Sequence, residues 1–213
     1  MIIRNINSYF QYSFKANFNK AEQQAIDMVR AYSQKYGVET AQIIKNGINI
    51  TDKFQISEAP DAVMVSASNE VDKIFDLKGL SKIKAFINSV KSMINFKQDL
   101  QDSIYIHSHT TEMPLSPADI YTGVRFGIKK MVAVTPSGKT SVVEDLNINQ
   151  TKAQSALSIF NSQIQAGVEL REKFGEDYMQ IPQAFKTIQK GQSEAIDEFA
   201  KTTGVKYSSD IEI

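Results

Sequence analysis

Residues 103–127 read SIYIHSHTTEMPLSPADIYTGVRFG and contain both histidines of the 213-residue chain. The first five residues are apolar enough to predict a strand, and that strand runs directly into the two histidines. Proline is favoured at the first position of a helix, so Ser116 and Pro117 predict a helix that continues to about Gly127. The sequence therefore predicts a strand, a loop and a helix, with the histidines at the end of the strand.

The rest of the chain supplies further elements on both sides of this unit. Asn19 followed by Glu22 is a capping-box pattern that predicts a helix behind it, and the Asn46-Gly47 pair predicts a tight hairpin. Helices are predicted over residues 20–35, 80–96, 149–174 and 182–202, and strands over residues 38–44, 48–57, 62–68, 131–135 and 140–144.

This order predicts an α+β fold in which a mixed sheet is flanked by helices and followed by a C-terminal helical extension. We divide the chain into an N-terminal helical segment (1–37), a core (38–146) and a helical extension (147–213). Apolar residues of the extension have two interpretations: they pack back on the core, or they bind a partner or a second copy of the chain.

Composition excludes several classes of protein. Lys plus Arg and Asp plus Glu number 24 each, so no strong field attracts nucleic acid or anionic lipid. The chain has no cysteine, which removes disulfides, thiol nucleophiles and cysteine-based zinc sites. No apolar run reaches the roughly 20 residues of a membrane helix, and the N-terminus lacks the apolar core of a signal peptide. We therefore expect a cytoplasmic protein that binds neither nucleic acid nor membrane.

The two histidines have the spacing of a metal site. Alternate side chains of a strand point to the same face, so His107 and His109 project together and can share one ion. Asp119, in the first turn of the predicted helix, is the candidate third ligand.

Each of these features also has a simpler interpretation. An H-x-H pair occurs by chance in loops, and Ser116-x-x-Asp119 is an ordinary capping box.

Hydrolysis at such a site also requires a base that does not bind the metal. The upstream candidates are Glu39, Glu58 and Glu70, and the histidine loop itself contributes Glu112 as a competing ligand or base. Glu39 is the preferred candidate because it begins the 38–44 strand. An acid in that position is, alternatively, a solvated edge residue without a chemical role.

Taken together, these features have a recognisable order. HSHTTEMPLSPAD resembles the H-x-H…S-x-x-D signature of the JAB/MPN (JAMM) metalloprotease family. The family's fold places an acid on an early strand, then a long helix, a strand that ends in the histidine pair, and a helix that carries Ser and Asp. Here Glu39, the 80–96 helix, the 103–107 strand and the helix after Ser116 follow in that order.

The resemblance covers about residues 38–144 and includes two departures. Thr110 follows the second histidine where the family usually has proline. The gap of six residues between His109 and Ser116 is one shorter than the spacing common in the eukaryotic deubiquitinases. Both departures concern the geometry of the loop more than the identity of the ligands.

The resemblance implies a JAB/MPN-like, cytidine-deaminase-like fold and a zinc-dependent peptidase or isopeptidase. By this comparison, His107, His109 and Asp119 bind Zn²⁺, Glu39 is the general base, and Ser116 stabilises the oxyanion. The implied substrate is a protein or peptide, with ubiquitin-like tails among the candidates. The alternative is a JAB-like binding or assembly module of a phage or mobile element, in which the zinc is structural.

Overall fold

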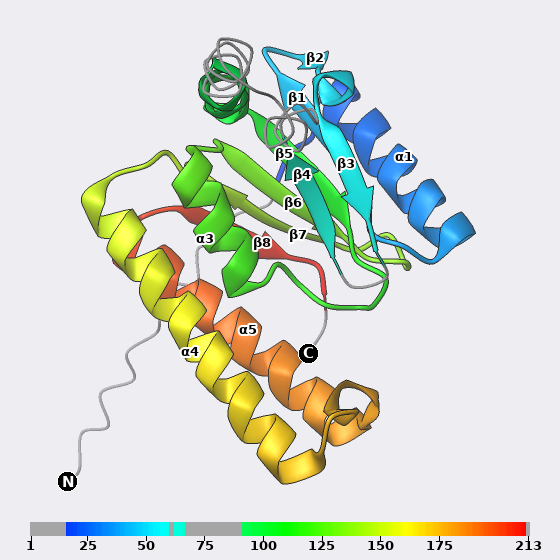
Figure 1. The fold of residues 1–213 in the computed structure, drawn as a ribbon, viewed down its shortest axis with the longest axis vertical. Coiled ribbons are helices and arrows are strands. Elements are labelled where there is room, and N and C mark those ends of the chain that lie inside the picture. Colours follow the sequence, from blue (N-terminus) through cyan, green and yellow to red (C-terminus); the bar gives the residue numbers. More distant parts are fainter. Residues whose placement is uncertain (1–15, 60–61, 67–90, 212–213) are drawn as a thin grey trace, which may run out of the picture.

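A computed structural model describes residues 16–59, 62–66 and 91–211 (Figure 1). The N-terminal part of the predicted 80–96 helix and the candidate base Glu70 lie outside the described residues. Within the described part, residues 91–100 are helical.

The named helices are α1 (Lys20–Tyr36), α3 (Pro117–Phe126), α4 (Gln150–Phe174) and α5 (Pro182–Thr203), with 3₁₀ turns at Thr51–Lys53 and Tyr178–Gln180. The strands are β1 (Ala41–Lys45), β2 (Ile48–Asn49), β3 (Gln55–Glu58), β4 (Val63–Ser66), β5 (Ile104–Ser108), β6 (Lys130–Val134), β7 (Thr140–Glu144) and β8 (Lys206–Ser209).

Six strands form one mixed sheet in the order β2-β1-β5-β6-β7-β8, and β3 and β4 form a separate hairpin. Strands β5 and β6 are parallel, whereas the other pairs of the large sheet are antiparallel. The crossover between the two parallel strands contains α3. A mixed sheet with flanking helices confirms the predicted α+β class.

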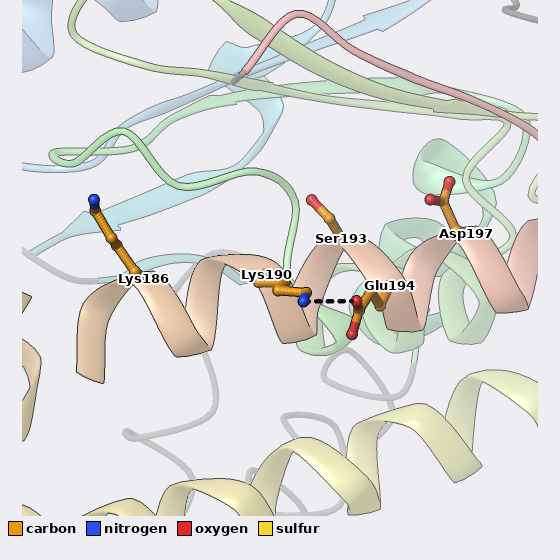
Figure 2. Close-up of a pocket in the computed structure, with 5 residues that line it drawn as sticks. All are labelled: Lys186, Lys190, Ser193, Glu194 and Asp197. Carbon is orange, nitrogen blue, oxygen red and sulfur yellow. Dashed lines mark ion pairs between the residues drawn. The ribbon is translucent and has the colours of Figure 1, made fainter. Parts of the chain in front are cut away.

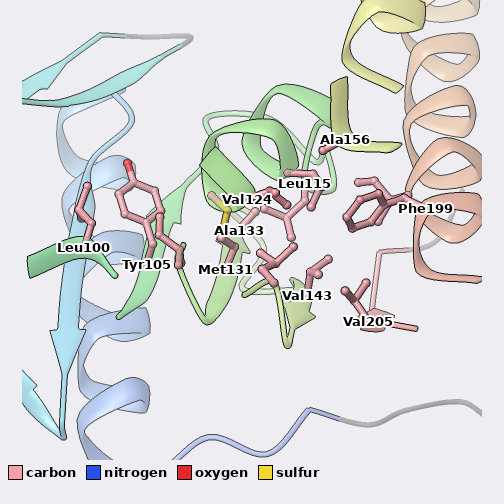
Figure 3. Close-up of a cluster of buried hydrophobic side chains, with 14 of the residues drawn as sticks. Leu100, Tyr105, Leu115, Val124, Met131, Ala133, Val143, Ala156, Phe199 and Val205 are labelled. Atoms are coloured by element: carbon pink, nitrogen blue, oxygen red, sulfur yellow. The ribbon is translucent and has the colours of Figure 1, made fainter. Parts of the chain in front are cut away.

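Helices cover both faces of the large sheet (Figure 1). On one face, α1 packs through Ala25, Ile26 and Val29 against β-strand residues such as Ile106 and Val132. The opposite face is covered by α3, α4 and α5, and its core runs from Tyr105 to the fully buried Phe199 (Figure 3). Because side chains alternate along a strand, successive residues of β5 point to opposite faces of the sheet.

The predicted helix and hairpin signals act where expected. The Asn19 side chain caps α1 by accepting the Glu22 N–H at 3.0 Å. Asn46 and Gly47 have φ angles of 53° and 75°, the left-handed values that a two-residue hairpin requires. The predicted helices 20–35, 149–174 and 182–202, and the strands 131–135 and 140–144, agree with the observed elements to within one residue at each end.

The chain after residue 147 contains more than helices. Helices α4 and α5 pack against each other and against α3, and the last described strand, β8, pairs antiparallel with β7 in the large sheet. The sequence analysis did not predict β8. The C-terminal residues therefore extend the sheet of the core. No described helix has both the length and the apolar character needed to cross a bilayer.

A buried lysine joins α1 to the sheet. Lys130, at the start of β6, pairs with Glu22 of α1 at 2.7 Å and with Glu144 of β7 at 2.9 Å. Its ammonium also donates to the Asn17 carbonyl at 3.2 Å and lies over the Phe18 ring. The side chains of Lys130 and Glu22 are each only 7% exposed, so each charge depends on the other for compensation.

We predict that Lys130→Met destabilises the protein by about 3 kcal/mol or more, because it leaves the Glu22 carboxylate buried without its cation. Urea unfolding measures the change. Adding Glu22→Gln to Lys130→Met should restore part of the loss. Lys190→Met, which removes an exposed ion pair with Glu194, should cost less than about 0.5 kcal/mol. Equal effects of the two lysine substitutions would contradict this account of Lys130.

Candidate metal centre

The two histidines lie where β5 ends and enters the loop to α3. His107 is 1% exposed and His109 is 7% exposed. Their Nε2 atoms are 3.0 Å apart, and their ring centroids are 4.9 Å apart. The alternation of an extended strand thus brings both imidazoles to one face, as the H-x-H spacing predicts.

Asp119 reaches the same point from the first turn of α3. Its Oδ1 lies 3.6 Å from Nε2 of His107, and its Oδ2 lies 3.9 Å from Nε2 of His109. One ligand atom from each of these three residues falls within 4.8 Å of the other two. Tetrahedral coordination with bonds of about 2.0–2.1 Å separates ligand atoms by roughly 3.3 Å. The observed distances are close to that value, so the group can hold a metal ion.

The capping box at the start of α3 orients Asp119. Asp119 Oδ2 accepts the Ser116 N–H and the Ser116 hydroxyl, each at 2.7 Å, while Oγ of Ser116 accepts the Asp119 N–H at 3.2 Å. The predicted capping box is therefore present, and the carboxylate also serves the histidine pair. Asp119 can both cap α3 and contact the histidines, because its Oδ2 accepts the bonds from Ser116 and its Oδ1 approaches His107.

A backbone carbonyl fixes the tautomer of His109. Its Nδ1 lies 2.8 Å from the Met113 carbonyl oxygen, and a carbonyl only accepts hydrogen bonds. The Nδ1 atom of His109 therefore carries the hydrogen, and its Nε2 presents a lone pair. Consequently, Nε2 of His107 donates to Nε2 of His109. To hold a metal ion through both Nε2 atoms, the two rings would have to give up this hydrogen.

The electrostatics agree with this hydrogen-bond pattern. Burial by itself lowers the pKa of His107, but the charges of the Asp119 and Glu39 carboxylates raise it above the ordinary value. Burial and the neighbouring His107 lower the pKa of His109 to about 4. Burial opposes the ionisation of Asp119, yet the two histidines and the Ser116 N–H keep its pKa below the usual range. Asp119 therefore favours the charged form of His107, whereas His109 stays a neutral imidazole down to about pH 4.

Glu39 lies beside this group but not on a strand, which corrects the predicted strand of residues 38–44. Strand β1 begins at Ala41, opposite His107. The ladder ends there because the Ser108 hydroxyl accepts the Thr40 N–H at 3.0 Å and the Glu39 N–H donates to Ala59 at 2.8 Å. The charge of Glu39 acts on His107 and on Tyr105, so its carboxylate is close to the site. It does not belong to the group of three ligand atoms.

Two other candidate acids have different contacts. The Glu58 carboxylate accepts hydrogen bonds from the hydroxyls of Tyr32 and Thr40, at 2.8 and 2.5 Å. The Glu112 carboxylate accepts both the N–H and the hydroxyl of Ser137, at 2.9 and 2.7 Å. Partial burial opposes ionisation of Glu112, but these Ser137 bonds lower its pKa. Among the described acids, Glu39 is thus the one whose charge acts on His107 although it is not one of the three candidate ligands.

The sequence analysis did not single out Tyr105. This buried side chain faces the same side of β5 as His107, and the two ring centroids are 5.4 Å apart. Burial, followed by the charges of Asp119 and Glu39, raises the pKa of its hydroxyl. Its position two residues before His107 is the sequence signal that places it at the site, because side chains two apart on a strand share a face.

A groove of about 610 Å³ along α5 lies elsewhere on the chain (Figure 2). Its described lining residues are Lys186, Lys190, Ser193, Glu194 and Asp197. These include two cations and two anions, so the groove has no net preference for a charged ligand. None of them belongs to the histidine–aspartate group.

The sequence matches no protein-family model and no curated protein. The interpretation of the site therefore rests on its geometry and on the motif resemblance.

We predict that metal affinity increases with pH. The raised pKa of His107 means that a proton must leave its Nε2 before a metal binds, so affinity should fall about tenfold per unit of pH below that pKa. His109 has a pKa of about 4, so its protonation competes with metal binding only in more acidic solution. Zinc competition with a chromophoric chelator between about pH 5 and pH 8 measures the slope. A pH-independent affinity would contradict the proposed displacement of the proton.

Proposed function

We propose that this chain is a zinc-dependent hydrolase of peptide or isopeptide bonds, of the kind that the JAMM-like signature implies. The observation that carries the proposal is the convergence of His107, His109 and Asp119 on one point. Two imidazoles and a carboxylate form the three-ligand set of many catalytic zinc sites, which leave a fourth position for water or substrate. The absence of cysteine from the chain is consistent with this donor set.

His107, His109 and Asp119 would hold the ion, and second contacts keep two of them in place. The Met113 carbonyl orients the His109 ring, and Ser116 orients the Asp119 carboxylate. When bound, zinc supplies Lewis-acid polarisation of a carbonyl and lowers the pKa of a water molecule towards ~7. Asp119 also benefits from the positive end of the α3 dipole, which favours its ionised form.

In this proposal Glu39 is the proton carrier. It is close enough for its charge to act on His107, yet it is not one of the three ligands. A carboxylate in that place accepts a proton from the attacking water and returns it to the leaving amine. The Glu58 carboxylate instead accepts hydrogen bonds from the hydroxyls of Tyr32 and Thr40.

Ser116 can stabilise the oxyanion only by redirecting its hydroxyl. That hydroxyl donates to Oδ2 of Asp119 at 2.7 Å. The Ser116 N–H donates to the same oxygen, also at 2.7 Å, so Asp119 keeps one bond from this residue when the hydroxyl turns to a substrate. We propose a protein or peptide substrate, with a ubiquitin-like tail as the candidate that the resemblance suggests.

We predict that Glu39→Gln keeps the metal but lowers turnover at least about 100-fold, because the amide cannot accept a proton. His107→Ala should remove both the metal and the activity. Elemental analysis of the purified protein measures metal content, and cleavage of ubiquitin-like fusions and of a peptide library measures turnover.

Glu58→Gln is the matched control, since it makes the same chemical change in an acid that contacts Tyr32 and Thr40. It should retain both metal and activity. Full activity in Glu39→Gln would assign the base to another group. A wild-type protein that holds one zinc but cleaves no substrate would favour the alternative, a JAB-like binding or assembly module with a structural zinc.

A further inference from the structure

The C-terminal helix pair contacts the histidine loop through a buried glutamine. Gln189 of α5 is 7% exposed, and its amide nitrogen donates to the Glu112 carbonyl oxygen at 2.7 Å. The next residue is Met113, whose carbonyl accepts the Nδ1 hydrogen of His109. One peptide unit therefore separates the contact made by α5 from the contact that orients a candidate ligand.

The other helix of the pair reaches the start of α3. Gln163 of α4 accepts the Ala118 N–H at 3.2 Å through its side-chain oxygen. The first N–H groups of a helix have no partner within the helix, so an external acceptor fixes this end. Ala118 immediately precedes Asp119. Each helix of the C-terminal pair thus bonds to the backbone beside one candidate ligand.

The Gln189 contact matters because the backbone of the histidine loop has little other support. Within the described part of the chain, no backbone–backbone hydrogen bond involves residues 111–115. The loop is held by burial of Met113 and Leu115, by the bonds of Glu112 to Ser137, and by Gln189. Side-chain contacts therefore determine where the Met113 carbonyl lies, and with it the orientation of the His109 ring.

The geometry points to Gln189 and Gln163 as positioning residues of the metal centre, which makes the α4–α5 pair a functional part of the site. Gln189 acts as a donor to the histidine loop, and Gln163 acts as an acceptor for the helix that carries Asp119. The inference rests on the proposed metal-binding function. Loss of a group that bonds and orients a metal ligand commonly lowers metal affinity 10- to 100-fold, and the two glutamines fix the backbone beside such groups.

The opposite hydrogen-bond roles of the two glutamines allow a matched test. Gln189→Glu keeps the shape of the side chain but removes the donor, so zinc affinity should fall at least about tenfold. Gln163→Lys removes the acceptor for the Ala118 N–H but keeps a long polar side chain, so zinc affinity should fall here as well. Gln189→Lys restores a donor and should recover affinity relative to Gln189→Glu. Zinc competition gives the affinities, and the absorption spectrum of the cobalt(II) form reports ligand geometry.

Gln192→Glu is the control for a buried charge on α5. Gln192 is 9% exposed, and its side-chain oxygen has no hydrogen-bond partner within the described residues. This control should bind zinc as the wild type does at temperatures where circular dichroism shows both to be folded.

If Gln189→Glu binds zinc with wild-type affinity and an unchanged cobalt spectrum, the inference is overturned while the proposed function stands. If the wild type itself binds no zinc, both are overturned.

Discussion

The alternation of side chains along β5 is the constraint on which the site depends. It directs His107 to one face and Ile106 and Ser108 to the other, where Ile106 packs under α1 and the Ser108 hydroxyl accepts the Thr40 N–H. The side chains of Ile106 and Ser108 therefore anchor β5 to α1 and to the segment before β1. The histidine side chains take no part in that anchoring, and Asp119 and the Met113 carbonyl supply their polar contacts.

The parallel connection from β5 to β6 explains why Asp119 arrives at the histidines. The crossover passes through α3, so the carboxyl end of β5 and the amino end of α3 must lie close to each other. Crevices at the carboxyl ends of parallel strands are common ligand sites in such sheets. The capping box at Ser116 uses the Asp119 carboxylate, which also faces the two histidine rings. One carboxylate therefore both caps α3 and contributes to the candidate metal site.

Much of this arrangement could be predicted from sequence because its signals are local. The capping residues Asn19 and Ser116, the Asn46-Gly47 turn and the H-x-H spacing each act over a few residues, and each is present in the structure. The start of β1 was placed too early because the Ser108 hydroxyl, a contact from another strand, replaces a ladder bond at Thr40.

Features that depend on distant contacts were not predicted. Strand β8 is short, with exposed or half-buried side chains, and only its pairing with β7 defines it. The glutamines of α4 and α5 are chemically ordinary until the fold places them beside Glu112 and Ala118. A helical pattern predicts that a glutamine lies on a helix, but it does not specify the loop that the side chain will contact.

The charges of the group explain why a further carboxylate belongs near it. When His107 is protonated, its positive charge balances the negative charge of Asp119, and the buried group is neutral. Replacing that proton by a divalent cation leaves an excess of one positive charge in a place with little solvent, and such an excess is costly unless an anion lies nearby. Glu39 is the described acid whose charge already acts on His107 from outside the ligand group. His107, His109 and Asp119 would hold the cation, and the Glu39 carboxylate would lower the electrostatic cost of its charge. The same carboxylate is the group that accepts a proton in the proposed reaction.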